Sequence, residues 1–374
     1  MKRYDGLFEK IATLENLKLA HRMAKKGKKD YQQVQMVDSD PDYYLGRILE
    51  KLLDGTYHTS PYVKFEKFDR NKVREIYKLP YYPDRIVHWA IMIQLEPILM
   101  GTMIDQTCAA LPGRGIHHAL RIEDDYLTNH PEETTYCLKL DVKKFFQNID
   151  KDILYGMLKN KIKDKKLLAL LEEIIYSCED TGIPIGNYSS QYFANFYLAY
   201  FDHWVKEVLK ARFYIRYMDD MVIFHHSKEV LRDYFYKISE YLDTNLKLTI
   251  KSNYQIFPVD VRGVDFVGYR HFRTFILLRK TTAKNFKRKM KGLAKLGYIT
   301  ENGYSSIKSY EGWMKCCDSY RLYHKYIDPL QSNIEYYETV KGVKQLNEID
   351  HSSEEYINAN TSDGDYAYVS DGAH

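Results

Sequence analysis

The sequence contains few cysteines, and their spacing suits neither disulfides nor a metal. The five cysteines are odd in number and include no C-x-x-C pair, which argues against a disulfide framework and against a zinc site. A long apolar run is also missing: the best stretch, residues 88–100, contains Gln94 and Glu96 and is shorter than the ~18 residues of a membrane span. The N-terminus lacks the apolar segment of a secretory signal. We therefore expect a soluble intracellular chain with no membrane partner and with reduced cysteines: Cys108, Cys137, Cys178, Cys316 and Cys317.

Basic residues are absent from the end of the chain. Residues 346–374 hold seven acids and no lysine or arginine, so residues 1–345 hold all 55 basic residues and 44 of the 51 acids. The net charge of the whole chain, +4, therefore conceals a body of +11. A basic body indicates a polyanionic partner, although a solvated basic surface would give the same excess. The tail lacks apolar periodicity, so we expect residues 346–374 to be flexible.

Apolar periodicity and turn residues predict a chain of mixed helices and strands. Leucine and isoleucine at near-helical spacing, with nine basic residues by Lys29, predict a basic amphipathic helix within the first thirty residues. Further helices are expected at 43–53, 83–100, 151–176, 190–209 and 279–296. Strands are expected at 62–68, 74–79, 135–140, 213–217 and 221–224.

Acidic residues stand at the ends of the expected strands. Asp219 and Asp220 lie at the tip of the hairpin formed by 213–217 and 221–224, and Asp141 follows strand 135–140. Acids at a hairpin tip can be ordinary turn residues, because aspartate tolerates turn conformations. If the strands lie side by side in one sheet, however, the three carboxylates meet and supply the hard oxygen ligands that magnesium prefers. Two such ions could align and neutralise the groups of a phosphoryl transfer.

The order of short segments resembles that of reverse transcriptases over about residues 40–340. The segments that carry the resemblance are 78–80 with 84–87 (Lys-Leu-Pro, Asp-Arg-Ile-Val), 111–115 (Leu-Pro-Gly-Arg-Gly), 140–146 (Leu-Asp-Val-Lys-Lys-Phe-Phe), 217–220 (Tyr-Met-Asp-Asp) and 266–269 (Phe-Val-Gly-Tyr). The second segment is similar to that of group II intron enzymes. Five segments in the family's order are far more specific than any one of them.

The resemblance implies an α+β fold of the right-hand polymerase type, with a palm of antiparallel sheet plus helices. The implied parts are an N-terminal helical extension (1–60), fingers (61–135, with part of 155–190), palm (136–275), helical thumb (276–345) and the flexible acidic tail (346–374). The implied activity is that of an RNA-directed DNA polymerase, a nucleotidyltransferase that uses two Mg²⁺ ions. Residues 346–374 leave no room for an RNase H or endonuclease domain, so we expect those activities to come from elsewhere.

The family's catalytic positions carry matching residues in this chain. Asp141, Asp219 and Asp220 fall on the catalytic, metal-binding aspartates, and Val142 adjoins the first of them in the implied metal site. Phe146 falls on the aromatic steric gate. A bulky ring there excludes the ribose 2′-hydroxyl, so DNA is the expected product. Packing in the core is the alternative role for Phe146.

The loop before helix 190–209 departs from the general family pattern. Most reverse transcriptases carry Gln-Gly there and end the loop in Ser-Pro, but this chain has Ile185-Gly186 and then Ser190-Gln191. This form is similar to reverse transcriptases of diversity-generating retroelements, which copy a template RNA with errors concentrated at adenines and use the cDNA to replace part of a protein-coding gene. A glutamine at 185 could hydrogen-bond near the sugar, whereas isoleucine cannot. We therefore expect Ile185, Gly186 and Gln191 to bind nucleotide, with a buried loop anchor as the alternative for Ile185.

The remaining implied contacts are with the triphosphate and with nucleic acid. Arg74 falls where the fingers bring a cation to the triphosphate, although it could also be a solvated strand cation. Helix 279–296 falls on the thumb, where lysine and arginine would bind phosphates while Phe286 and Met290 pack inward. Trp313, in a later thumb segment, is expected in the core. The expected nucleic-acid contacts are Arg114, Tyr217, Met218, Lys284, Lys287, Arg288 and Lys291.

The resemblance also implies partners and a cellular setting. The partners are template RNA, its cDNA, dNTPs and a small basic accessory protein, which could dock on the N-terminal helix or the acidic tail. The expected location is the cytoplasm of a bacterial, phage or archaeal host cell. Two other functions stay open: a reverse transcriptase of a retron, a defence system or a group II intron, and, in another class, a non-catalytic RNA-binding scaffold. Three intact carboxylates, which repel one another without metal, argue against the scaffold.

Overall fold

The computed structural model describes residues 3–69, 72–179 and 182–341, so the predicted flexible tail lies outside the described residues. The chain forms two compact units, each built from segments that are distant in sequence. Unit 1 contains residues 1–111, 141–210 and 234–253, and unit 2 contains residues 112–140, 211–233 and 254–374. None of the helices in the described part of the chain combines the length and apolar character that a membrane crossing requires.

Unit 1 is mostly helical and is built around α5 (Ile86–Met100). Because α5 is apolar on all sides, it can pack against several neighbours at once, and α2 (Leu14–Ala24) and α10 (Tyr188–Tyr197) both lie against it. Asn16 of α2 donates its side-chain amide to the carbonyl oxygen of Ala90 at 3.0 Å, which fixes these two helices. The other helices of unit 1 are α1 (Phe8–Ile11), α3 (Gln32–Ser39), α4 (Pro41–Leu53), η1 (Tyr81–Arg85), α7 (Phe145–Asn148), α8 (Lys151–Lys161), α9 (Lys165–Tyr176) and α11 (Ala199–Glu207).

Unit 1 also contains a two-stranded hairpin, as the sequence predicted. Its strands are β1 (Val63–Asp69) and β2 (Lys72–Lys78), which pair antiparallel with Lys67 opposite Arg74. A further short strand, β3 (Thr107–Cys108), belongs to the same unit. The hairpin carries Arg74, so this part of unit 1 bears on the candidate site.

Unit 2 contains a sheet with the strand order β5-β6-β4-β7. The strands are β4 (Tyr136–Asp141), β5 (Phe213–Tyr217), β6 (Asp220–His225) and β7 (Gln255–Pro258), and both β5–β6 and β4–β7 pair antiparallel. Helix α6 (Ile116–Asn129) packs on the sheet, with the ring of Tyr126 edge-on to Phe213 at 5.1 Å. The strands predicted at 135–140, 213–217 and 221–224 are confirmed. Helix α12 (Lys228–Leu246) follows β6 and contributes residues to both units.

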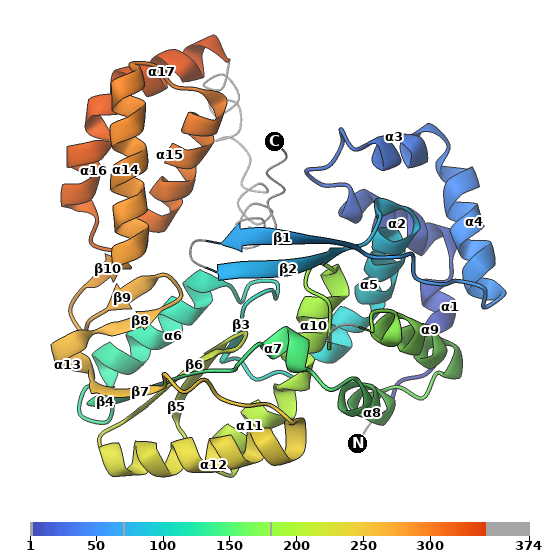
Figure 1. Cartoon of the computed structure of the whole chain (residues 1–374), viewed down its shortest axis with the longest axis horizontal. Coiled ribbons are helices and arrows are strands. Elements are labelled where there is room, and N and C mark those ends of the chain that lie inside the picture. The colour runs from blue at the N-terminus through green and yellow to red at the C-terminus, as the bar shows by residue number, and fades with distance from the viewer. Residues whose placement is uncertain (1–2, 70–71, 180–181, 342–374) are drawn as a thin grey trace. The chain divides into compact units, whose positions relative to one another are not determined.

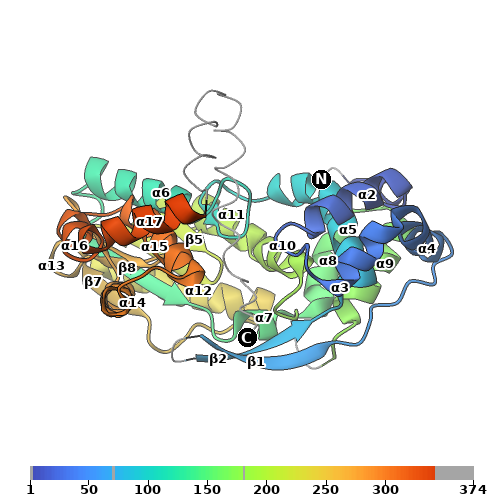
Figure 2. The ribbon, with the colours of Figure 1, turned by 90° about the horizontal axis from the view of Figure 1, so that it is seen from above.

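The rest of unit 2 is a small sheet followed by a group of helices. Helix α13 (Val259–Arg262) precedes strands β8 (Val264–Phe266), β9 (Tyr269–His271) and β10 (Ile276–Leu278), in the order β10-β9-β8. Helices α14 (Lys280–Leu296), α15 (Glu301–Met314), α16 (Tyr320–Tyr326) and α17 (Gln331–Val340), with the turn η2 (Asp328–Leu330), gather in one bundle, as both views show (Figures 1 and 2). Phe286 and Met290 of α14 are buried in it, as predicted.

Three helices predicted as continuous are each two helices in the structure, so those predictions were wrong in extent. Within the first thirty residues, α1 and α2 are separated before Leu14, because Thr13 is extended and its hydroxyl accepts from the backbone N–H of Asn16 at 3.1 Å. The predicted helix 151–176 divides into α8 and α9, where Asp164 caps the second helix. The predicted helix 190–209 divides at Leu198 into α10 and α11. In the first two cases a capping side chain starts a new helix inside a continuous apolar pattern.

Candidate active site

Asp219 and Asp220 lie at a tight hairpin tip in unit 2. Tyr217 pairs with Asp220, so Met218 and Asp219 alone form the turn between β5 and β6. Met218 adopts a left-handed backbone conformation with φ +57°. The side chain of Arg216, which is fully buried, donates to the Met218 carbonyl oxygen at 2.8 Å. This buried cation fixes the turn, so the two carboxylates have a defined place at the end of the strand pair.

Asp220 is held by a lysine from the neighbouring strand. Lys139 of β4 lies 3.2 Å from Asp220 Oδ2, with side chains only 24% and 28% exposed. The other carboxylate oxygen, Oδ1, is buried and accepts no hydrogen bond. In the sheet order β4 and β6 are neighbours; β4 ends at Asp141 and β6 begins at Asp220. Lys139 and Asp141 are two residues apart on one strand, so their side chains leave the same face of β4.

Asp141 has its own lysine partner in unit 1. Lys251 Nζ lies 2.5 Å from Asp141 Oδ2, and the backbone N–H of Lys251 donates to the Asp141 carbonyl oxygen at 2.8 Å. The adjoining Val142 is fully buried and forms an isolated bridge with Ile250. Asp141 Oδ1 is buried and accepts no hydrogen bond. A buried carboxylate oxygen without a donor is a site where a hard divalent cation fits.

The structure does not by itself display a metal centre. Among the described residues, no three or more histidine, cysteine, aspartate or glutamate side chains are gathered closely enough to hold an ion. Asp141 and Asp220 are instead each paired with a lysine. The expected metal role of Asp141, Val142, Asp219 and Asp220 therefore stays a prediction, supported by the chemistry of the donors.

A loop in unit 1 ties three of the expected nucleotide-binding residues together through the backbone. The Ile183 N–H donates to the carbonyl oxygen of Phe146 at 2.8 Å, and the Tyr77 N–H of β2 donates to that of Ile185 at 2.9 Å. Gly186 has φ +129°, and a Cβ there would lie 2.7 Å from the Tyr77 carbonyl oxygen. Only glycine fits such a close approach at this backbone conformation. The loop therefore links β2 to the segment that carries Phe146.

The side chains of these residues are partly accessible. Phe145 is buried, whereas Phe146, whose ring meets it edge-on at 5.6 Å, is only half-buried. The side chain that packs fully in the core is thus Phe145. Ile185 is half-buried too, as are Arg74 on β2 and Gln191 on α10. The nucleotide-binding roles of these residues stay predictions.

The expected nucleic-acid contacts all belong to unit 2. Arg114 lies in the loop before α6 and is half-buried, as are Tyr217 and Met218 at the hairpin. The four basic residues on α14 are exposed on the side opposite its buried apolar residues: Lys284, Lys287, Arg288 and Lys291. Trp313 packs on the segment 266–269, where its ring leaves no space for a Cβ at Gly268 and its carbonyl oxygen accepts from Tyr269 Oη at 2.9 Å. Trp313 is half-buried, so it packs on this segment without being one of the fully buried core residues that the sequence predicted.

Three charged residues at the site escaped the sequence prediction. Lys139 could have been found, because it precedes Asp141 by two positions in a strand and so shares its face. Arg216 is a fully buried arginine in an apolar strand, which is itself an unusual pattern. Lys251 lies 110 positions after Asp141, and nothing in its local sequence indicates the contact.

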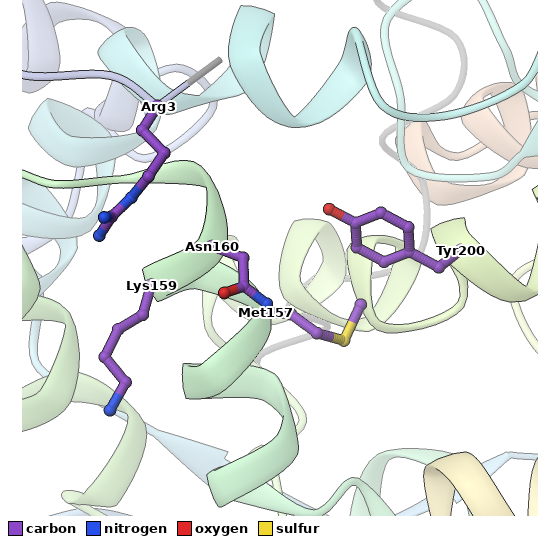
Figure 3. Close-up of a pocket in the computed structure, with 5 residues that line it drawn as sticks. All are labelled: Arg3, Met157, Lys159, Asn160 and Tyr200. Carbon is purple, nitrogen blue, oxygen red and sulfur yellow. The ribbon is translucent and has the colours of Figure 1, made fainter. Parts of the chain in front are cut away.

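A separate hollow lies elsewhere in unit 1. Figure 3 shows this open cavity of about 620 Å³, with Tyr200 on one side and the basic side chains on the other. Its lining residues are Arg3, Met157, Lys159, Asn160 and Tyr200. None of them is an expected site residue, so this cavity is not the candidate active site.

Comparison with known families identifies the chain's class. The family model described as reverse transcriptase (RNA-dependent DNA polymerase) matches residues 65–271, which is more than half of the chain. The chain belongs to the reverse transcriptase family. The predicted enzyme class is thereby confirmed at the level of the family, and so is the α+β fold of the right-hand polymerase type.

Curated relatives include proteins encoded in group II introns. The group II intron-encoded protein LtrA of Lactococcus lactis is 29% identical over 178 residues, covering 45% of this chain and 29% of LtrA. Protein YkfC of Escherichia coli is 25% identical over 169 residues, covering 42% of this chain and 44% of YkfC. The match thus spans less than half of either relative. The predicted kinship with group II intron enzymes is confirmed.

Solved structures also resemble this chain. One is the telomerase from Candida albicans, solved with a fragment of telomeric RNA. The matched region spans 80% of this chain and 63% of the telomerase chain, at 12% sequence identity and a TM-score of 0.47. An apo telomerase from Candida tropicalis covers 66% of this chain, at 10% identity and a TM-score of 0.41.

Proposed function

We propose that this chain is an RNA-directed DNA polymerase that copies a template RNA into cDNA, with Asp141, Asp219 and Asp220 as its catalytic, metal-binding residues. The observation that carries the proposal is the position of these acids within the family match: Asp141 ends β4, and Asp220 begins the adjacent strand β6, with Asp219 in the turn just before it. The buried Asp141 Oδ1, which accepts no hydrogen bond, supports a place for a cation there. Divalent cations, Mg²⁺ in our proposal, would neutralise the triphosphate and align the primer 3′-hydroxyl.

The chain's own residues hold and select the substrates. The half-buried ring of Phe146 would meet the 2′ position of the sugar and exclude ribonucleotides. Arg74, on the hairpin whose second strand also binds the Ile185 loop, would contact the triphosphate. The exposed basic face of α14 would bind backbone phosphates of the template–primer duplex without reading its sequence.

Replacing both acids of the hairpin tests the catalytic assignment. The double variant Asp219→Ala with Asp220→Ala should lose Mg²⁺-dependent extension of a primed RNA template. Asp243→Ala is a matched control, because Asp243 is an exposed acid on α12. Extension retained by the double variant would overturn the assignment, whereas an equal loss in Asp243→Ala would point to a general defect.

We further propose that the polymerase is of the diversity-generating type, with errors concentrated at template adenines. The support is the Ile185-Gly186 loop, whose backbone is bound to β2 and to the Phe146 segment. Losing one positioning contact worth about 1.4 kcal/mol changes the ratio between the rates of correct and incorrect nucleotide incorporation about tenfold. In this proposal the chain acts with a small basic accessory protein in the cytoplasm of a bacterial, phage or archaeal host cell.

Sequencing cDNA made on a defined RNA, with the accessory protein present, tests this finer proposal. Ile185→Gln should lower misincorporation opposite adenine more than opposite the other bases. An even error spectrum in the unsubstituted enzyme would favour a retron, defence or group II intron enzyme. An unchanged spectrum in Ile185→Gln would remove the role of Ile185.

A further inference from the structure

Lys139 contacts three groups from two different strands of unit 2. Its Nζ lies 3.2 Å from Asp220 Oδ2 at the start of β6 and donates to the carbonyl oxygen of Asp265 in β8. It also lies over the ring of Phe266, 5.9 Å from the centroid. The lysine thus joins a proposed metal-binding carboxylate to the small sheet that leads into α14.

The contacts on β8 hold Lys139 in place independently of Asp220. A carbonyl oxygen and an aromatic face both favour an ammonium group. Asp265 is itself fixed, because its carboxylate binds Arg279 Nε at 2.5 Å and the Arg279 N–H donates to the Gly268 carbonyl oxygen at 2.9 Å. If Asp220 turned toward another partner, the charge of Lys139 would stay beside it.

A fixed positive charge at this place opposes the arrival of a second cation. The side chains of Lys139 and Asp220 are less than a third exposed, so solvent screens their charges less than at the surface. A divalent cation that binds Asp220 must displace Lys139 from Oδ2 and then remain near its ammonium group. Like charges in partly buried sites raise the free energy of binding.

We propose that Lys139 is a positioning residue that neutralises Asp220 in the cation-free enzyme and sets the affinity of the site for divalent cations by competing for Asp220 Oδ2. This inference rests on the proposed metal role of Asp220. It differs from an architectural role, in which Lys139 would only connect β4 to β8, because it makes cation affinity depend on the charge at position 139.

Direct cation binding, measured without catalysis, tests the proposal. Mn²⁺ is titrated into the full chain, and free Mn²⁺ is followed by electron paramagnetic resonance. Lys139→Gln retains an amide donor toward the Asp265 carbonyl oxygen but lacks the charge, so its Mn²⁺ dissociation constant should fall by about tenfold. Lys139→Arg keeps the charge and should stay close to the unsubstituted chain.

A matched control lies in the same unit. Lys228 is half-buried and rests over the ring of Tyr136 at 4.9 Å, and Lys228→Gln should leave Mn²⁺ affinity unchanged. Equal Mn²⁺ affinities for Lys139→Gln, Lys139→Arg and the unsubstituted chain would refute the proposal that Lys139 competes with the cation for Asp220. If Lys139→Gln does not fold, Lys139→Met tests the same loss of charge, and Mn²⁺ binding by Lys139→Met no tighter than by the unsubstituted chain also counts against the proposal.

One further arm separates this inference from the proposed function. The double variant Asp219→Ala with Asp220→Ala should lose Mn²⁺ binding. If it binds like the unsubstituted chain, the metal site itself is wrongly assigned. If it loses binding while Lys139→Gln behaves like the unsubstituted chain, the metal site stands and the role of Lys139 is refuted.

Discussion

Gly182 is the position where a single methyl group should disturb both the fold and the proposed nucleotide site. It is buried, and its N–H donates to the Gln147 carbonyl oxygen at 3.0 Å. A Cβ at this position would lie 2.5 Å, 2.7 Å and 2.9 Å from the carbonyl oxygens of Ile149, Phe146 and Gln147. All three are backbone atoms, so no side-chain rotation relieves the overlap, and the loop must move away from α7.

The size of the effect follows from these contacts. Overpacking a well-filled site costs about 1–3 kcal/mol, and a buried hydrogen bond that is lost adds about 1 kcal/mol. We expect Gly182→Ala to lower the free energy of unfolding by about 3 kcal/mol. Gly156→Ala is the matched control: Gly156 lies within α8 and a Cβ there meets nothing within 4 Å, so alanine should stabilise the helix by about 0.5–1 kcal/mol.

Urea unfolding followed by circular dichroism measures the first effect, and nucleotide selection measures the second. Gly182→Ala should lower the urea midpoint by about 1 M. It should also raise ribonucleotide incorporation by about tenfold, because the loop binds the backbone of Phe146 and a tenfold change needs only about 1.4 kcal/mol. A midpoint equal to that of the unsubstituted chain would refute the packing argument. Lower stability with unchanged sugar selection would refute the link to Phe146.

Two other predictions concern charges in unit 2. Although burial lowers the pKa of His271, its contacts with Glu123 at 3.3 Å and Asp124 at 3.1 Å raise it overall. The stability that these contacts supply is fully present below the pKa of the unfolded state, about 6.5, and is lost as the pH rises through the higher pKa of His271 in the folded state. The urea midpoint of the unsubstituted chain should therefore fall between pH 6 and pH 8.5, and His271→Gln should make this fall smaller. On α14, Lys287→Glu should weaken template–primer binding. It should also reduce, by roughly one or more, the magnitude of the slope of the logarithm of the association constant against the logarithm of salt concentration. Fluorescence anisotropy at several salt concentrations measures this, and an unchanged slope would place Lys287 off the duplex.

The sequence predicted best where local pattern and tertiary structure agree. The hairpin of β5 and β6 was found within one residue, because alternating apolar strands flank a short polar turn. The helix pairs α8–α9 and α10–α11 were merged, because apolar periodicity continues across the break. Asp164 caps α9 by accepting from the Leu167 N–H at 3.1 Å, but aspartate is common in many contexts. Its other carboxylate oxygen accepts from the distant Phe8 N–H at 2.8 Å, a contact that no local pattern reveals.

In the candidate site too, the sequence predicted the residues that a local pattern marks but not the contacts between distant segments. The acids stand at strand ends, which a local pattern can show. The hydrogen bond between Tyr77 and Ile185 and the ion pair between Lys251 and Asp141 join segments about a hundred residues apart. Such pairs depend on how the chain folds back, and a single sequence carries no periodicity that encodes them.

The two lysines explain how acidic strand ends persist in a folded chain. Neighbouring carboxylates repel one another, and each resists the loss of water on burial. Lys251 pairs with Asp141 in unit 1, and Lys139 pairs with Asp220 in unit 2, so each unit supplies its own counter-charge. Asp141 and Asp220 are therefore each compensated by a lysine in the structure. Because both ion pairs are only partly buried, a cation can replace a lysine without stranding a fully buried charge. If the proposed metal role is correct, this arrangement favours a stable cation-free protein and reversible binding of a divalent cation over a permanently held metal.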